Sequence, residues 1–307
     1  MSTIPLITDD EARSVVSVAD ALHVVEETYA DLGARRITLS DPEVIRLAGA
    51  GGGFALKGAM LDRYGVAGVR LLPTHTGNGW CLVLETASGR PLVAVAETWL
   101  HRLRTAASAV VAARLLASED ARVLTLVGAG RIAELVPAAF AAAFDVRELR
   151  VTSRTPESAA ALAARVDLPG VTAKPYPTVD EAAQDADVLI AITAATAPVV
   201  HARHLRPGMT VIGLGGGPEL AAGVADVADR CYVDQIGYAR EVGSVAGWAR
   251  AGVRVEERLA GDLPAVVNGR VPGRTGERET IVAVVQGVAA CDVALACLVT
   301  RRLGVRS

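Results

Sequence analysis

The chain has 307 residues, of which 51% are hydrophobic and 21% charged, and its net charge is -3. This length suits about two domains, and the apolar content excludes wholesale disorder. The near-neutral charge favours neither nucleic acid nor an anionic membrane as a partner.

Targeting and cysteine patterns are equally plain. Acidic residues occupy positions 9–11, where a signal peptide would have a basic and then an apolar region, and no stretch reaches the roughly 18 apolar residues of a membrane span. The four cysteines lack CxxC spacing, so we expect no metal site. We expect a cytoplasmic protein with no membrane partner.

The N-terminal part mixes helices and strands without alternation. Apolar residues recur at helical spacing from Thr8 to Leu32, and a second long helix is predicted from about Thr98 to Ala117. Four short apolar runs between Gly-rich turns are predicted strands: Phe54–Leu56, Ala67–Leu72, Cys81–Leu84 and Leu92–Val95. Such a pattern indicates an α+β layer.

After Ser118 the pattern changes to strict β-α-β alternation. Predicted strands are Arg122–Val127, Leu149–Thr152, Val171–Tyr176, Asp187–Thr193, Met209–Leu214 and Arg230–Val233. Predicted helices are a segment from Gly130 through Phe144, Pro156–Val166, Val179–Ala186 and finally Glu279–Leu303. Alternation of this kind predicts an α/β fold with a doubly wound parallel sheet of Rossmann type.

The strongest motif is G-x-G-x-x-A, which follows an apolar strand and opens a predicted helix. Gly128 permits the tight turn, Gly130 lets the backbone approach a pyrophosphate, and Ala133 allows close helix–sheet packing. Glycines also occur in such turns for steric reasons alone. The strand before and the helix after favour a dinucleotide site.

The end of the next strand indicates which dinucleotide. An NAD site places an acidic residue there, whereas this chain has Ser153-Arg154-Thr155, followed by Ser158. A guanidinium with hydroxyl groups suits a 2′-phosphate, so NADP(H) is favoured over NAD(H). The alternative is that Arg154 is a solvated loop cation.

These residues complete a pattern that extends over nearly the whole chain. The matching segments are Lys57-Gly58-Ala59, Val66–Val69, Asn78, Ser88–Leu92, Arg104–Ser108, Val127–Gly130, Ser153–Pro156, Leu205–Gly208, Val233-Asp234, Glu279–Ile281 and Gly287–Asp292. The chain resembles the ornithine cyclodeaminase/mu-crystallin family, and the Arg-Thr-Ala-Ala run before the Rossmann strand is the most specific part of the resemblance.

The resemblance implies a homodimer with an active site in a cleft between two domains. It implies a dimerisation and substrate domain of residues 1–117 with 279–307, and a Rossmann domain of residues 118–278. With the motifs above, it gives the candidate cofactor-binding set: Arg104, Thr105, Gly128, Ala129, Gly130, Arg131, Ile132, Ala133, Ser153, Arg154, Thr155, Ser158, Thr193, Ala194, Ala195, Gly213 and Gly287.

Two departures from the family pattern bear on activity. Ornithine-cyclising members have a lysine where this chain has Arg70, and they carry an aspartate in a Gly-Ala-Asp-x-Pro segment that here reads Gly213–Pro218 without an acid. Arginine stays cationic at any working pH, so it can bind a carboxylate but cannot shuttle a proton. The departures disfavour cyclodeamination, and the glycine run is expected to leave room for a bulkier substrate.

Four cations remain as candidate substrate-binding residues: Arg46, Lys57, Arg70 and Arg104. The resemblance places them near the substrate, and together they predict an anionic amino or imino acid. Lys57 and Arg70 are the candidate catalytic residues, with Lys57 as a proton donor tuned by burial. Each could instead be a surface cation or form an internal ion pair. His75 and Glu97 lie near the same strands, and His75 is a second possible acid.

Three functions from different classes remain open. The first is an NAD(P)H-dependent oxidoreductase acting on a C–N bond, either an imine reductase or an amino-acid dehydrogenase. The second is an ornithine cyclodeaminase-type ammonia lyase, and the third a non-catalytic NADPH-dependent binder similar to mu-crystallin. Arg154 favours the first, because NADPH pools drive reductions, and the missing aspartate weakens the second.

Overall fold

The computed structural model describes residues 3–50, 52–74 and 77–305, and it divides into two compact units. The first unit comprises Met1–Arg104 with Val288–Ser307, and the second comprises Thr105–Gly287. The predicted boundary between residues 278 and 279 falls before a strand that belongs to the second unit.

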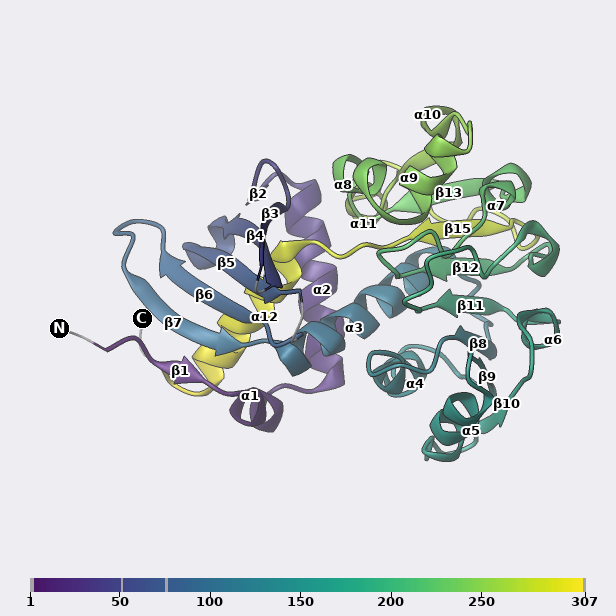
Figure 1. Ribbon diagram of the computed structural model, residues 1–307, viewed down its shortest axis with the longest axis horizontal. Helices are drawn as coiled ribbons and strands as arrows, with labels where there is room; N and C mark the ends of the chain where they lie inside the picture. The colour runs from purple at the N-terminus through teal and green to yellow at the C-terminus, as the bar shows by residue number, and fades with distance from the viewer. Residues whose placement is uncertain (1–2, 51, 75–76, 306–307) are drawn as a thin grey trace. The chain divides into compact units, whose positions relative to one another are not determined.

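A seven-stranded, largely antiparallel sheet forms the first unit, in the order β1-β7-β6-β5-β4-β2 with β3 paired to β4. Its strands are β1 Leu6–Ile7, β2 Ile37–Leu39, β3 Ile45–Gly49, β4 Gly52–Leu61, β5 Val66–Pro73, β6 Trp80–Glu85 and β7 Pro91–Ala96. Its helical segments are α1 Asp9–Val15, α2 Val18–Gly33, η1 Asp62–Tyr64, the start of α3 Thr98–Leu116, and α12 Ala289–Arg302. The yellow helix α12 lies against β4, β5 and β6 (Figure 1).

The predicted helix Thr8–Leu32 is two helices. Thr8 forms a capping box with Glu11, and Ser17 forms a second one with Asp20, so the chain starts a new helix at Val18. The second box satisfies two backbone N–H groups that would be bonded within the helix if the segment were a single continuous helix.

Eight parallel strands build the sheet of the second unit, in the order β10-β9-β8-β11-β12-β15-β13-β14. They are β8 Val123–Val127, β9 Glu148–Thr152, β10 Thr172–Pro175, β11 Val188–Ala191, β12 Thr210–Gly213, β13 Arg230–Val233, β14 Leu259–Asp262 and β15 Ile281–Val284. The helical segments are the rest of α3, η2 Ala133–Leu135, α4 Val136–Ala141, α5 Pro156–Ala164, α6 Val179–Ala183, η3 Ala202–His204, α7 Ala222–Val227, α8 Ile236–Glu241, α9 Gly243–Arg250, α10 Val255–Arg258 and α11 Leu263–Val267. The predicted doubly wound parallel sheet is confirmed.

Two predicted helices were wrong in detail. The segment after Gly130 passes through a 3-10 turn before α4, which ends at Ala141, and Pro137 occupies its first turn. The segment Glu279–Leu303 contains β15 before α12 begins at Ala289. A buried β-branched strand of four residues cannot be distinguished from helix by periodicity alone.

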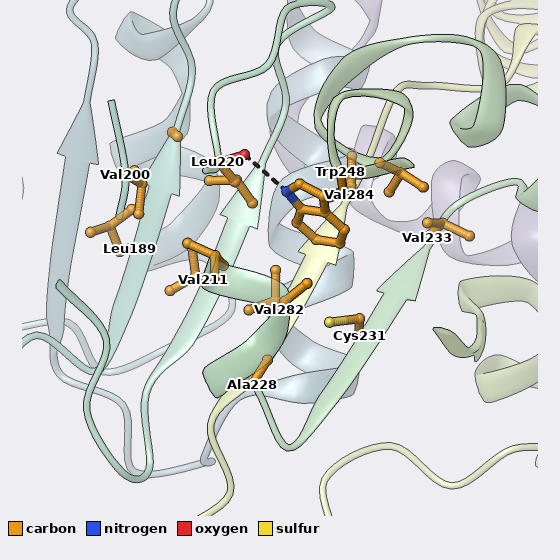
Figure 2. Packing of buried hydrophobic residues seen from close by; sticks show 14 of the residues in the cluster. Leu189, Val200, Val211, Leu220, Ala228, Cys231, Val233, Trp248, Val282 and Val284 are labelled. Atoms are coloured by element: carbon orange, nitrogen blue, oxygen red, sulfur yellow. Dashed lines mark hydrogen bonds between the residues drawn. The ribbon is translucent and has the colours of Figure 1, made fainter. Parts of the chain in front are cut away.

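The core on one side of this sheet is assembled from aliphatic strand residues around one tryptophan. Trp248 of α9 is 1% exposed, and its indole N–H donates to the Leu220 carbonyl at 2.9 Å (Figure 2). Val211, Val282 and Val233 from neighbouring strands pack in the same cluster. This packing fixes the strand ends from which the functional loops start. Among the described residues, no helix is long and apolar enough to cross a membrane.

Candidate functional site

A cavity of about 570 Å³ lies in the second unit, lined by residues at the carboxyl ends of β8, β9 and β11. The strand order reverses between β8 and β11: β9 and β10 are added on one side of β8, whereas β11 and β12 are added on the other. Ligands of open α/β sheets bind at this switch point. The cavity therefore stands where the fold places a nucleotide.

The turn after β8 has the geometry that the G-x-G motif requires. Gly128 has φ +118°, and a Cβ there would collide with the Ile192 carbonyl oxygen. Gly130 differs, because a Cβ there would meet no protein atom within 4 Å. Packing thus requires the first glycine, while the second leaves open space beside the cavity. A closely approaching phosphate fits that space.

Charge in the cavity has one sign. Among the described residues that line it, Arg154 is the charged one, and none is acidic. Arg154 is exposed, and beside it the Ser153 hydroxyl donates to the Thr155 carbonyl at 2.6 Å. Thr155 caps α5 without a side-chain hydrogen bond. The lining therefore favours an anion near Arg154.

The lining contains most of the predicted cofactor set: Gly128, Ala129, Gly130, Ser153, Arg154, Thr155, Ser158, Thr193, Ala194 and Ala195. The others lie outside this lining. Arg131, Ile132 and Ala133 follow the glycine turn, Gly213 ends β12, Gly287 follows β15, Thr105 lies in α3, and Arg104 belongs to the first unit.

The glycine run after β12 does not leave a general vacancy. A Cβ at Gly215 would collide with the Glu219 carboxylate, and one at Gly217 with the Ala195 carbonyl oxygen. Open space exists only at Gly216, where a Cβ would meet nothing within 4 Å. The expectation of extra room for substrate is therefore corrected to this single position.

Glu219 was missed by the sequence reasoning. It is fully buried, and its carboxylate accepts from the backbone N–H of Thr193 and, at 2.5 Å, from that of Gly215. Burial raises the pKa of this carboxyl group, although these hydrogen bonds oppose the shift. Glu219 thus ties a cavity-lining loop to the glycine loop. The available signal was an acid two residues after a glycine run.

A group of charged and titratable side chains, which we call the arginine cluster, lies in the first unit, and all of its members except the partly exposed His101 are buried. It consists of Arg70, Glu97, His101, Arg104 and Asp292. They come from β5, the start of α3 and α12, with Glu97 just before α3. Helical spacing brings His101 and Arg104 to one face of α3.

Arg70 lies at the centre and is 1% exposed. Its Nε donates to Glu97 Oε2 at 2.9 Å, and its Nη1 forms an ion pair with Asp292 Oδ2 at 3.0 Å. Burial lowers the pKa of Arg70, but the two carboxylates outweigh it and hold the pKa above its ordinary value. Arg70 therefore has the internal ion pairs that the sequence left as an alternative to substrate binding.

The pKa values of the two acids, Glu97 and Asp292, are shifted in opposite directions. Burial raises the pKa of Glu97 despite Arg70. Burial also acts to raise the pKa of Asp292, but Arg104 and Arg70 outweigh it and hold that pKa below its ordinary value. Arg104 Nε donates to Asp292 Oδ1 at 2.8 Å.

Lys57 and Arg70 face each other across β4 and β5, so their side chains share one face of the sheet. Lys57 is 7% exposed, and its Nζ lies 3.9 Å from Glu43 Oε1. Arg46 pairs with Ala55 on β3 and β4, and it is exposed. Lys57 is thus close to the arginine cluster in the sheet, whereas Arg46 lies at the solvent. His75 lies outside the described residues.

No group of three or more His, Cys, Asp or Glu residues suited to a metal ion occurs in the described ranges.

Fold and cavity together define a two-unit protein built on a Rossmann-type sheet. A sequence profile of the ornithine cyclodeaminase/mu-crystallin family matches residues 67–305. The chain belongs to that family.

Three proteins to which the chain is similar have names that describe different activities. An uncharacterized cyclodeaminase of Sinorhizobium fredii is 26% identical, over 100% of this chain and 98% of the relative. A Δ1-pyrroline-2-carboxylate reductase of Bacillus cereus is 27% identical, over 77% and 76%. The solved structure of an archaeal alanine dehydrogenase dimer with bound NAD superposes with a TM-score of 0.91 at 25% identity, covering 97% of this chain and 95% of that one.

Proposed function

We propose that this protein is an NAD(P)H-dependent oxidoreductase that acts on the C–N bond of an amino or imino acid, as an imine reductase or amino-acid dehydrogenase. The similarity to a pyrroline-carboxylate reductase and to an alanine dehydrogenase supports this class of reaction. We further propose that NADP(H) is preferred over NAD(H).

The second unit would hold the cofactor in the cavity at the switch point. The Gly128–Gly130 turn would receive the pyrophosphate, and Ser153, Arg154 and Thr155 the ribose with its 2′-phosphate. The absence of an acid among the described lining residues supports the preference for a 2′-phosphate. A bound nicotinamide supplies or accepts the hydrogen and electron pair at the substrate carbon.

The first unit would bind the substrate. Arg104 would pair with the carboxylate, with Arg46 as a second, exposed anchor. Lys57, buried and near Glu43, would hold the proton for the substrate nitrogen. Arg70 would act indirectly, through Glu97 and Asp292, because these two carboxylates already occupy its guanidinium group.

One observation favours the oxidoreductase over the ammonia lyase. At Gly215 the space for a side chain is filled by the Glu219 carboxylate, which is bonded to two backbone N–H groups. Gly215 has no side chain to manage the amine protons that cyclisation of a diamino acid requires, and the Glu219 carboxylate beside it is engaged by backbone N–H groups. An imine reductase needs only one delivered proton and an oriented substrate.

We also propose a homodimer built on the outer face of the first unit's sheet. Leu47 opposes Phe54 and Leu71 opposes Trp80 across neighbouring strands, and all four are at least 38% exposed. Contiguous exposed apolar surface of this kind marks an interface. Helix α12 packs against β4, β5 and β6 of its own unit and is buried there, so it is not part of this exposed face.

The test is to follow NADPH absorbance with a panel of cyclic and acyclic imino acids, and in parallel to measure ammonia released from ornithine. We expect NADPH consumption with at least one carboxylate-bearing imine and no ammonia from ornithine. Release of ammonia and proline from ornithine without net change in NADPH would identify a lyase. Binding of NADPH with no turnover of any substrate would identify a binder.

A further inference from the structure

The ring of His101 is held between two guanidinium groups. Its Nδ1 lies 3.1 Å from Nη2 of Arg70 and 3.0 Å from Nη2 of Arg104. His101 has no assigned part in the proposed function, although its neighbour Arg104 does. The same Nδ1 also lies 3.4 Å from Asp292 Oδ1.

These neighbours determine the tautomer. Guanidinium groups donate hydrogen bonds and cannot accept them, so Nδ1 must be the acceptor and the ring proton must be on Nε2. A proton on Nδ1 would point at two N–H donors and gain at most one long contact with Asp292. The geometry therefore selects the neutral Nε2–H form.

The charges around the ring keep it neutral. Arg104 faces it from its own helix, Arg70 from β5 and Asp292 from α12, while Glu97 is paired with Arg70. Although the side chain is 36% exposed, desolvation by its neighbours and then the Arg104 charge lower the pKa of His101, and the nearby Asp292 opposes this only in part. The Nδ1 acceptor thus persists at neutral pH.

Two contacts fix the plane of Arg104. Its Nε donates to Asp292 and its Nη2 to His101, so two acceptors from different helices meet the same edge of the guanidinium group. With one contact alone the group could rotate about that bond, whereas two contacts define its plane. A fixed plane is what paired recognition of a carboxylate needs.

We propose that His101 is a positioning residue, whose neutral Nδ1 fixes the guanidinium plane of Arg104 for binding the substrate carboxylate. The inference rests on the proposed function, in which Arg104 binds that carboxylate. The inference adds that carboxylate binding requires a hydrogen-bond acceptor at the position of His101 Nδ1.

Three substitutions at one position separate the acceptor from the ring. In His101→Asn the amide oxygen replaces Nδ1 at the same distance along the side chain, in His101→Gln the oxygen lies one bond further out, and His101→Leu has no acceptor. His101→Leu should raise KM for the imine about tenfold or more, because a hydrogen bond to a charged group is lost. In His101→Asn the KM should return most of the way to the wild-type value, and in His101→Gln it should not.

The control is His23→Leu, since His23 is exposed on the same unit with a single Glu27 contact. It should leave KM unchanged, and all variants should bind NADPH with the wild-type Kd. Rescue by His101→Gln and not by His101→Asn would overturn the proposal, as would an unchanged KM in His101→Leu.

A nitrogen NMR spectrum of the wild-type protein tests the same point without turnover or mutation. We expect the His101 ring to show the Nε2–H tautomer and no titration between about pH 5 and 8. An Nδ1–H tautomer, or titration near the ordinary histidine pKa, would refute the positioning role. If no imine is turned over, the proposed function fails, and the spectrum still decides the state of His101.

Discussion

Asp292 offers a direct test of the arginine cluster. It lies on α12, 2% exposed, with Arg104 Nε at 2.8 Å from one oxygen and Arg70 Nη1 at 3.0 Å from the other. Asp292→Asn keeps the shape and removes the charge, so two buried guanidinium groups lose the carboxylate that they share. Breaking a buried pair in this way costs about 3–5 kcal/mol of unfolding free energy.

The assay is urea denaturation at fixed protein concentration, because association would otherwise shift the midpoint. Asp226→Asn is the matched control, since the exposed Asp226 pairs with the partly exposed Arg258 at 3.2 Å. That surface pair should contribute less than about 1 kcal/mol. Equal losses in the two variants would refute the reasoning.

The same residue has a pH signature with a definite sign. Because the folded-state pKa of Asp292 is lowered, its contribution is complete above the ordinary aspartate range near about pH 4 and is lost as pH falls. The raised pKa of Glu97 acts in the opposite direction, since its protonation favours the folded state. Asp292→Asn should therefore lose less stability on acidification than the wild type does.

Further substitutions test the other parts of the account. Arg154→Asp should reverse the preference for NADPH over NADH, by about 1.5–3 kcal/mol in calorimetric titrations, and equal wild-type affinities would contradict the assignment. Glu219→Gln should weaken cofactor binding and lower the melting temperature, because one of two N–H donors loses its acceptor; unchanged values would exclude a structural role. Leu71→Lys should yield monomers in sedimentation, whereas the wild type should sediment as a dimer at micromolar concentration. Lys57→Met should abolish turnover with NADPH binding intact.

Local patterns were enough to predict most of the residues that line the cavity at the switch point. The strand before Gly128, the glycine turn and the residues around Arg154 lie within a short stretch of chain, and their geometry follows from one β-α-β unit. The same locality explains why the parallel sheet was predicted. β14 was missed because its four residues, Leu259–Asp262, include a glycine and an aspartate and have no alternation.

The arginine cluster depends on contacts that no local pattern encodes. Asp292 is 188 residues from Arg104 in the chain, and Glu97 is 27 residues from Arg70. Sequence reasoning identified the cations but not their partners, so it assigned Arg70 to the substrate. The helical spacing of Glu97, His101 and Arg104, which brings an acid, a histidine and a cation to one side of the start of α3, was the available signal.

Transfer of deuterium from NADPH labelled at the transferable position tests the proposed oxidoreductase most directly. With a carboxylate-bearing cyclic imine, the account predicts one deuterium on the substrate carbon of each product molecule and one NADP⁺ formed for each amino acid released. Deaminated product from ornithine, with the labelled cofactor unchanged in amount, would contradict it.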